Sequence, residues 1–300
     1  MTRPGARTLH WLKTAAGVRA RIREYFSDQG VLEVQTPVIT RYGVTDVHLH
    51  SVALNDGRFL RTSPEYAHKR LLAAGIGDLY ELGPVFRAGE HSRIHREEFT
   101  MLEWYRVDWH WRRLADEVVT IIRLTTGLDS DPVRVSWRDL ARQALGVDPL
   151  SEADALDALL DDAPPDLDLP ERLDWLFAMR MQNALPTRGI AIVHDFPACQ
   201  AALARLNPDD PATAERFEVF VNRVELANGY QELTDAVEQR RRFDEDNRRR
   251  SALGLNPMPV DETLLEAMAR GLPECAGVAL GVDRLVMLAA GEAALQDALD

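Results

Sequence analysis

The sequence predicts an α+β fold in which mainly antiparallel strands are flanked by helices. Residues 86–105 and 216–234 each read as two strands joined by a polar connection. Residues 11–29 and 111–126 carry apolar side chains at helical spacing. Because 46% of the 300 residues are hydrophobic, the chain can bury a large core, and we expect a single domain over residues 1–300.

The first helix is followed by extended chain. Gly30 is typical of the residue that ends a helix. Residues 31–40 and 46–54 then read as two strands. His48 and His50 share one face of the second, but no third ligand lies nearby in the sequence, so a metal site there is the lesser alternative.

Ser63-Pro64-Glu65 has the pattern of a helix start, and this helix is expected to run to about Gly75. Ser63 is the predicted N-cap residue and Pro64 the first helical residue. Judged locally, Glu65 complements the helix dipole.

The middle of the chain, residues 129–188, is rich in aspartate and proline and contains no chemical motif. We expect it to be a peripheral, variable segment of short helices and solvated loops. A buried strand is predicted at 189–194. A helix beginning near Asp235 has arginines at 240–242 and 248–250, which favour a solvated face, with partner binding as the alternative.

Residues 86–105 also contain the side chains of a binding site. Arg87 can hold a phosphate as a bidentate fork, Phe99 offers a face on which a base can stack, and Glu103 can hold a cation.

A second candidate site lies on the later strand pair. If Asn222-Arg223 forms the turn, Phe220 faces Glu225, and Glu218 becomes a same-face neighbour of Glu225. Two close carboxylates raise each other's pKa unless a cation lies between them. Mg²⁺ commonly takes one or two carboxylates plus substrate phosphates. A solvent-facing acidic edge is an equal alternative.

Two more stretches contribute candidate residues. A bulge or bend at Asn228-Gly229 would leave Tyr230 and Glu232 on one face. The glycine-rich residues 277–284 lead into an apolar run and end in an arginine that can meet an anion at a helix start. A tight strand-to-helix junction is the simpler alternative.

Composition restricts the function class. The net charge of −13 argues against a nonspecific polyanion binder. Two cysteines, Cys199 and Cys275, are too few for a disulfide framework. The chain has no apolar run of membrane-spanning length and no secretory signal pattern, so we expect a cytoplasmic protein without a membrane partner.

In combination, these features resemble the class II aminoacyl-tRNA synthetases over about residues 10–290. Pro37 after a long helix, the Phe-Arg/His/Phe segment and the closing Gly-x-Asp-Arg resemble motifs 1, 2 and 3. The stretches similar to the lysyl branch are TSPEYAHKRLL (62–72), EFTMLEWY (98–105), ELANGYQELTDA (225–236) and GVALGVDRLVML (277–288). The resemblance implies a class II catalytic domain and, from the place of Pro37, a homodimer.

Only about twenty residues precede the first motif, so no N-terminal anticodon-binding OB domain is expected. A stand-alone core of this kind resembles the elongation factor P–(R)-β-lysine ligase family. Members of that family activate (R)-β-lysine with ATP and join it to a lysine side chain of elongation factor P. Ser63 and Ala279, where the synthetases usually have Ala and Gly, favour this family. ATP and Mg²⁺, β-lysine and elongation factor P are therefore expected, without stable tRNA binding.

The resemblance implies a nucleotide site. Arg87 would hold the α-phosphate, Phe99 would stack on adenine, and Arg284 would bind the γ-phosphate. His95 would assist at the phosphates. The family motif Phe-Arg-x-Glu is altered here, because its acid comes one residue later, at Glu90. Backbone amides are expected to replace the adenine contact.

The resemblance also implies a metal site and an amino-acid site. Glu218 and Glu225 would bind Mg²⁺ through ATP. Glu103, Tyr105 and Glu232 would hold the distal ammonium, since a buried charge needs a paired carboxylate. The substrate-binding residues would be Ser63, Glu65, Glu103, Tyr105, Asn228, Tyr230, Glu232 and Ala279. Glu65 and Asn228 would contact the backbone groups of the amino-acid substrate. Ala279 would shape the pocket around the amino and carboxyl end of that substrate.

The expected reaction is a two-step, AMP-forming ligation. Arg87 and Arg284 would stabilise phosphate charge, and no nucleophilic side chain is assigned. One alternative is a truncated lysyl-tRNA synthetase paralogue that uses α-lysine with tRNA or another amine. The other is a noncatalytic regulatory paralogue that binds an amino acid or nucleotide.

Overall fold

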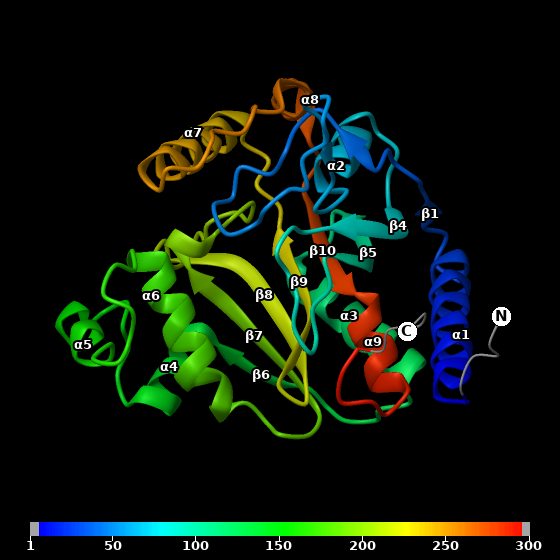
Figure 1. Ribbon diagram of the computed structural model, residues 1–300, viewed down its shortest axis with the longest axis horizontal. Coiled ribbons are helices and arrows are strands. Elements are labelled where there is room, and N and C mark those ends of the chain that lie inside the picture. Colours follow the sequence, from blue (N-terminus) through cyan, green and yellow to red (C-terminus); the bar gives the residue numbers. More distant parts are fainter. Residues whose placement is uncertain (1–5, 296–300) are drawn as a thin grey trace. The chain divides into compact units, whose positions relative to one another are not determined.

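The computed structural model describes residues 6–295, which form two compact units (Figure 1). Unit 1 contains the described chain up to Trp109, Thr120–Leu128 and the chain from Thr234 onward. Unit 2 contains His110–Val119 and Asp129–Leu233. Helix α3 (Trp111–Thr126) runs from one unit into the other and has the bounds that the sequence predicts.

Unit 1 holds the first and last parts of the chain. Its elements besides α3 are α1 (Ala6–Asp28), β1 (Leu32–Glu33), β2 (Ile39–Thr40), β3 (Phe59–Leu60), α2 (Glu65–Ala73), β4 (Leu79–Phe86), β5 (Glu98–Val107), α7 (Ala236–Ala252), α8 (Glu262–Gly271), β10 (Cys275–Gly281) and α9 (Val282–Ala289). Four of these strands lie in the order β1-β4-β5-β10, in which β1 is parallel to β4 and the other neighbours are antiparallel, while β2 and β3 form a separate antiparallel pair.

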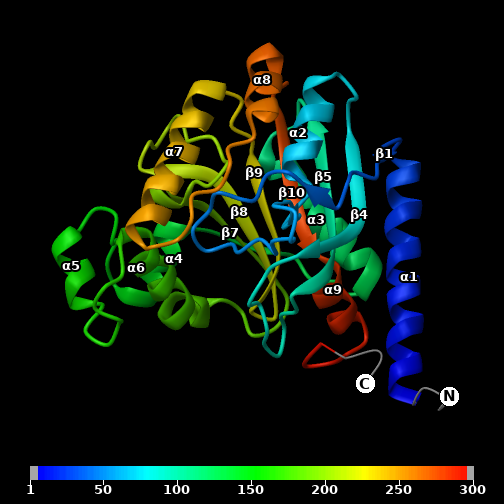
Figure 2. The ribbon, with the colours of Figure 1, turned by 45° about the horizontal axis from the view of Figure 1, so that its top comes forward.

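The helices of unit 1 pack in contacting pairs. Figures 1 and 2 show α1 beside α9, and α2 beside α8. Helix α1 faces the sheet through Val18, Ile22 and Phe26, which are buried at a spacing of four residues. The Phe26 ring stacks on Tyr80 at 4.4 Å between centroids. The predicted apolar face is therefore confirmed, except that Leu12 is exposed.

Unit 2 is built around the later strand pair. Its elements besides α3 are β6 (Val133–Ser136), α4 (Trp137–Leu145), α5 (Ala153–Ala158), α6 (Leu169–Leu176), the π-helix η1 (Phe177–Met181), η2 (Gln182–Ala184), β7 (Ile190–Pro197), η3 (Ala198–Gln200), β8 (Thr213–Val221) and β9 (Val224–Gln231). The strand order is β9-β8-β7-β6, antiparallel except for the β6–β7 pair.

The β8–β9 hairpin turns at Asn222 and Arg223, as predicted. Both residues have positive φ, 51° and 67°, which is the geometry of a two-residue hairpin turn whose twist matches the strands. Phe220 lies opposite Glu225, also as predicted. The predicted bulge at Asn228-Gly229 is wrong, because the register shift lies between Val219 and Phe220.

Three other predictions of local structure need correction. Residues 31–40 form two short strands rather than one, because the Thr36 amide donates to the Glu81 carboxylate instead of to a strand. Residues 46–54 form no regular strand, and the Asp46 side chain accepts from the His48 amide as in a turn. Helix α2 begins one residue later than expected, with Pro64 at the N-cap position, although the Ser63 hydroxyl accepts from the Glu65 amide.

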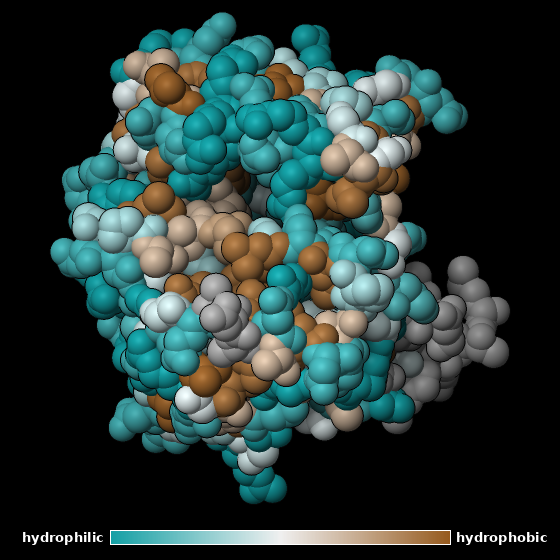
Figure 3. Space-filling model, turned by 90° about the vertical axis from the view of Figure 1, so that its left-hand side faces the viewer, coloured by the Kyte–Doolittle hydropathy of each residue, from teal (hydrophilic) through white to brown (hydrophobic). Residues whose placement is uncertain are grey.

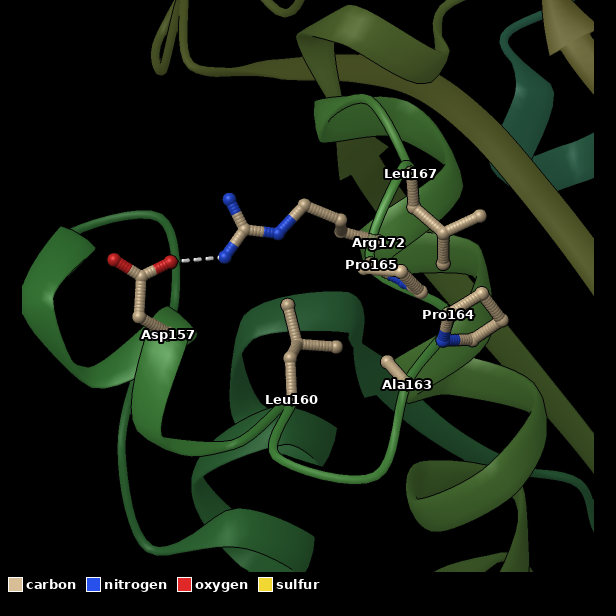
Figure 4. A pocket seen from close by; sticks show the side chains of 7 residues that line it. All are labelled: Asp157, Leu160, Ala163, Pro164, Pro165, Leu167 and Arg172. Atoms are coloured by element: carbon tan, nitrogen blue, oxygen red, sulfur yellow. Dashed lines mark hydrogen bonds and ion pairs between the residues drawn. The ribbon is translucent and has the colours of Figure 1, made fainter.

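The segment 129–188 is more ordered than the sequence suggests. It contributes the strand β6 and the helices α4 and α6, and it shares a hydrophobic core with β7 that includes Trp137, Leu173 and Val193. A cavity of about 290 Å³ lies between α5 and α6, and an ion pair between Arg172 and Asp157 borders it (Figure 4). None of the predicted site residues lines this cavity.

Within residues 6–295, no helix is both long and apolar enough to cross a membrane. On the face shown in Figure 3, hydrophilic residues surround smaller patches of apolar ones. At exposed positions of α7, Arg240 pairs with Glu262 and Arg241 with Glu238, which agrees with the predicted solvated face. Arg250 departs from that prediction, because it is buried and donates to the backbone carbonyl groups of Asn256 and Asp46.

Candidate active site

Arg87 directly follows β4 in unit 1. Its guanidinium carbon lies 5.2 Å from the centre of the Phe99 ring, which reaches it from the start of β5. The Nε atom of Arg87 is buried and has no hydrogen-bond partner among the described residues. A cation with an unused buried donor beside an aromatic ring can bind a phosphate and a base together. The structure thus brings these two predicted nucleotide residues together.

The connection after Arg87 turns at Gly89, whose φ of +81° favours glycine. The Gly89 amide donates to the Glu97 carboxylate at 2.7 Å. The acid that follows, Glu90, points back to Arg87, with 3.6 Å between its Oε1 and the arginine Nη1. Glu90 therefore forms an ion pair with Arg87, the residue that is predicted to bind a phosphate.

His95 lies at the far end of this connection, and Arg284 contacts the residue before it. The Nδ1 atom of His95 lies 2.7 Å from the Ser92 hydroxyl, which holds the ring across the turn. Arg284, in the first turn of α9, donates from Nε to the carbonyl of Ile94. The strand-to-helix junction β10–α9 therefore places Arg284 beside the loop that contains His95.

Glu103 lies in the middle of the unit 1 sheet. It is directly opposite Glu81 on β4 and Ala279 on β10, so all three side chains share one face. Only 2% of Glu103 is exposed. The Ser63 hydroxyl donates to its Oε2 at 2.6 Å and the Tyr105 hydroxyl to its Oε1 at 3.0 Å. The structure therefore assembles Ser63, Glu103 and Tyr105 as one cluster.

Glu65 lies in the first turn of α2, as predicted, but it does more than complement the helix dipole. Its Oε1 is 2.8 Å from Nζ of Lys69, a lysine that is fully buried. Burial raises the pKa of Glu65, while the Lys69 charge lowers it and the Glu103 charge raises it. Glu65 and Glu103 therefore act on each other electrostatically within this cluster.

His68 also belongs to this cluster, although it was not identified from the sequence. Its Nε2 lies 3.0 Å from Glu81 and its Nδ1 lies 3.4 Å from Glu103. Behind it, Arg61 donates to Glu81 at 2.7 Å. Burial alone lowers the pKa of His68, but the two glutamates outweigh it and raise the pKa above its ordinary value. The sequence held one indication of such a partner, because Glu81 is an acidic residue within the otherwise apolar strand 79–86.

Unit 2 presents the remaining predicted residues on its hairpin. Arg216 joins two of them, because its Nη2 donates to Glu218 at 2.6 Å and its Nε to Asn228 at 3.3 Å. The Asn228 amide in turn donates to the Tyr230 hydroxyl at 3.0 Å. Glu218, Asn228 and Tyr230 therefore form one hydrogen-bonded row around an arginine that the sequence did not single out.

Glu218 and Glu225 interact, as the hairpin register predicts. Burial raises the pKa of Glu218, Arg216 lowers it, and Glu225 raises it, with a net value of about 7. A buried carboxylate with a raised pKa beside a second one suits a divalent cation with oxygen ligands. No cluster of three or more acidic, histidine or cysteine side chains suited to a metal occurs in the part of the chain described.

Glu232, at the end of the same hairpin, is 1% exposed and pairs through its backbone with Ala204. Its joint role with Glu103 and Tyr105 around a distal ammonium stays a prediction.

A family model for class II tRNA synthetases specific for D, K and N matches residues 5–299. This chain belongs to that family. The family assignment confirms the predicted class II synthetase fold, an α+β domain with mainly antiparallel strands and flanking helices.

Curated relatives of this class II chain are named elongation factor P–(R)-beta-lysine ligase. Those of Salmonella paratyphi B, Salmonella enteritidis and Salmonella typhimurium are each 44% identical to it over 315 aligned positions. The match covers 99% of this chain and 95% of each relative. The predicted resemblance to this ligase family is therefore confirmed.

Proposed function

We propose that this protein activates (R)-β-lysine with ATP and transfers the β-lysyl group to a lysine side chain of elongation factor P. The observation that supports this most strongly is the 44% identity to ligases of that name over nearly the whole of both chains. The proposal makes the chain an AMP-forming ligase with ATP and Mg²⁺ as its cofactors.

The nucleotide would bind along the loop between β4 and β5. Arg87 would contact the α-phosphate through its unpaired buried donor, and Phe99 would stack on adenine. Arg284, which donates to the carbonyl of Ile94, would hold the γ-phosphate, and His95, the next residue along, would assist at the phosphates. Glu90 would keep the Arg87 fork oriented, and backbone amides near Gly89 would read the adenine edge.

The amino acid would bind against the buried Glu103. Its carboxylate is held by Ser63 and Tyr105, so its position is fixed before a ligand arrives. A distal ammonium paired with this carboxylate, and with Glu232, meets the requirement that buried charges be paired. Glu65, Asn228 and Tyr230 would contact the amino and carboxyl groups, and Ala279 would set the space beside Glu103.

Glu218 and Glu225 would hold Mg²⁺, and their paired acidic oxygens are the donors that this ion prefers. When bound, Mg²⁺ would offset negative charge on the phosphates during attack by the substrate carboxylate. Arg216 would favour the ionised form of Glu218, because a nearby cation stabilises the charged carboxylate.

These residues position the substrates and stabilise charge, and none of them acts as a nucleophile. Arg87 and Arg284 would stabilise the charge that develops as pyrophosphate leaves. In the second step the amine of the acceptor lysine would attack the adenylate carbonyl, and AMP would leave, so that an amide remains. A homodimer, a cytoplasmic location and the lack of stable tRNA binding belong to the same proposal.

The test is ATP–pyrophosphate exchange by the purified protein with (R)-β-lysine and with α-lysine, followed by intact-mass analysis of elongation factor P. We expect exchange with β-lysine and a mass increase of one β-lysyl group on elongation factor P. Charging of tRNA with α-lysine, and no mass increase, would identify a lysyl-tRNA synthetase paralogue. No exchange with either amino acid would leave only a noncatalytic binding role.

A further inference from the structure

His68 lies between two buried carboxylates on neighbouring strands. Its ring is fully buried, and its nitrogens approach Glu81 on one side and Glu103 on the other. A neutral imidazole has one N–H donor and one lone pair, whereas a protonated ring donates from both nitrogens. Because both nitrogens face carboxylate oxygens, only the protonated ring suits this position without turning a lone pair towards an anion.

The charges around His68 balance when it is protonated. Glu81 also accepts from Arg61, so the two cations Arg61 and His68 match the two anions Glu81 and Glu103. The nearby pair of Glu65 and Lys69 is neutral by itself. The titratable and charged groups facing His68 are therefore Glu81 from β4, Glu103 and Tyr105 from β5, Glu65 and Lys69 from α2, and Arg61 through Glu81.

We propose that His68 is a positioning residue whose imidazolium holds the Glu103 carboxylate in the empty site and loses its proton to solvent when a cationic amino acid binds there. This inference rests on the proposed function, because it takes Glu103 to be the partner of the distal ammonium. An ammonium beside Glu103 is a like charge close to His68, and a nearby like charge disfavours the protonated form. Ligand binding and proton release are then linked.

This linkage predicts the direction in which ligand affinity changes with pH. Protons compete with the ligand wherever His68 titrates in the free protein, so affinity for the diamino acid rises with pH. The contacts with Glu103 and Glu81 raise the pKa of His68, which places the effect above the ordinary histidine value of about 6.5. A ligand with an uncharged end does not repel the imidazolium and shows no such rise.

The experiment is isothermal titration calorimetry of the whole protein with (R)-β-lysine, in buffers of different ionisation enthalpy, from about pH 6.5 to about pH 9. The dependence of the heat on the buffer gives the number of protons released. We compare wild type with His68→Gln, which keeps a hydrogen-bonding side chain without titrating. The control variant is His10→Gln, an exposed histidine of α1. The control ligand is 3-aminohexanoic acid, which lacks the distal amine.

We expect proton release from wild type and His10→Gln with β-lysine only, and a roughly tenfold gain in affinity across the range that is absent in His68→Gln. Equal proton release from wild type and His68→Gln overturns the inference but leaves the proposed function standing. Wild type that binds no β-lysine overturns both. If His68→Gln does not fold, Glu81→Gln replaces it, and proton release as large as that of wild type then overturns the inference.

Discussion

The guanidinium of Arg216 donates a 2.6 Å hydrogen bond to the carboxylate of Glu218, two residues along the same strand. One of the two carboxylates proposed to bind Mg²⁺ is thus held by a cation of the protein itself. Even so, burial and the neighbouring Glu225 leave the pKa of Glu218 at about 7. Under the proposed function, protons and Mg²⁺ would therefore compete for Glu218 near neutral pH.

The Mg²⁺ requirement should depend on pH for this reason. Below about pH 7 Glu218 is protonated in the metal-free protein, so the Mg²⁺ concentration for half-maximal exchange should rise about tenfold per pH unit lost. Glu218→Gln should raise the Mg²⁺ concentration for half-maximal exchange and remove this slope. The control is Glu215→Gln on the same strand, whose carboxylate pairs with Arg205. A flat profile in wild type would contradict the prediction.

Glu81 should make folding stability sensitive to acid. Burial alone raises its pKa, but hydrogen bonds from His68 and Thr36 and the charge of Arg61 lower it to about 2. Its contribution is therefore present above its unfolded value of 4.5 and is lost as the pH falls towards 2. Glu81→Gln should lower the free energy of unfolding at pH 7 by about 3 kcal/mol and flatten this loss.

Urea unfolding at a series of pH values measures both effects. Glu98→Gln, at the exposed start of β5, serves as the control and should change stability by less than about 0.5 kcal/mol. Equal acid sensitivity of wild type and Glu81→Gln would show that other groups determine it.

Phe99 should matter for ATP affinity more than for turnover. Its ring lies beneath Arg87 and is proposed to stack on adenine. Phe99→Leu should raise the KM for ATP on the order of tenfold, because stacking on an aromatic face contributes about 1–3 kcal/mol. Phe99→Tyr should restore the wild-type KM in the exchange assay. A Leu variant with normal KM would place adenine elsewhere.

Ala279 should influence the choice between β-lysine and α-lysine. It lies directly opposite Glu103, so its methyl group borders the proposed amino-acid pocket. Ala279→Gly should shift the ratio of exchange rates towards α-lysine by about tenfold, the effect expected for one methyl group in a pocket. Ala276→Gly, a buried neighbour on the same strand, should leave the ratio unchanged while reducing stability.

The sequence was most informative where structure depends on local chemistry. The turn at Asn222-Arg223 and the helix 111–126 follow from turn residues and apolar spacing, and both were predicted correctly. Residues 31–54 were mispredicted because side chains replace strand pairing there. Glu81, which accepts the Thr36 amide, lies 45 positions further along the chain, so apolar alternation gives no sign of that contact.

The site shows the same division. Arg87, Phe99 and Glu103 were predicted as site residues because residue type and motif spacing mark them. His68 and Arg216 were missed because their importance comes from partners on other segments, or from a strand pleat that pairs Arg216 with Glu218. From sequence alone, an ionisable residue on a short helix is usually predicted to face solvent. Only the contact of α2 with β4 and β5 reveals His68 as buried.

The buried pair of Lys69 with Glu65 has one more consequence under the proposed function. An enzyme that makes a reactive adenylate for lysine amines risks acylating itself. This chain has two lysines, Lys13 and Lys69. Lys13 is exposed on α1, whereas Lys69 is fully buried with its Nζ 2.8 Å from Glu65. A low number of lysines, one of them buried, would limit acylation of the enzyme by its own product.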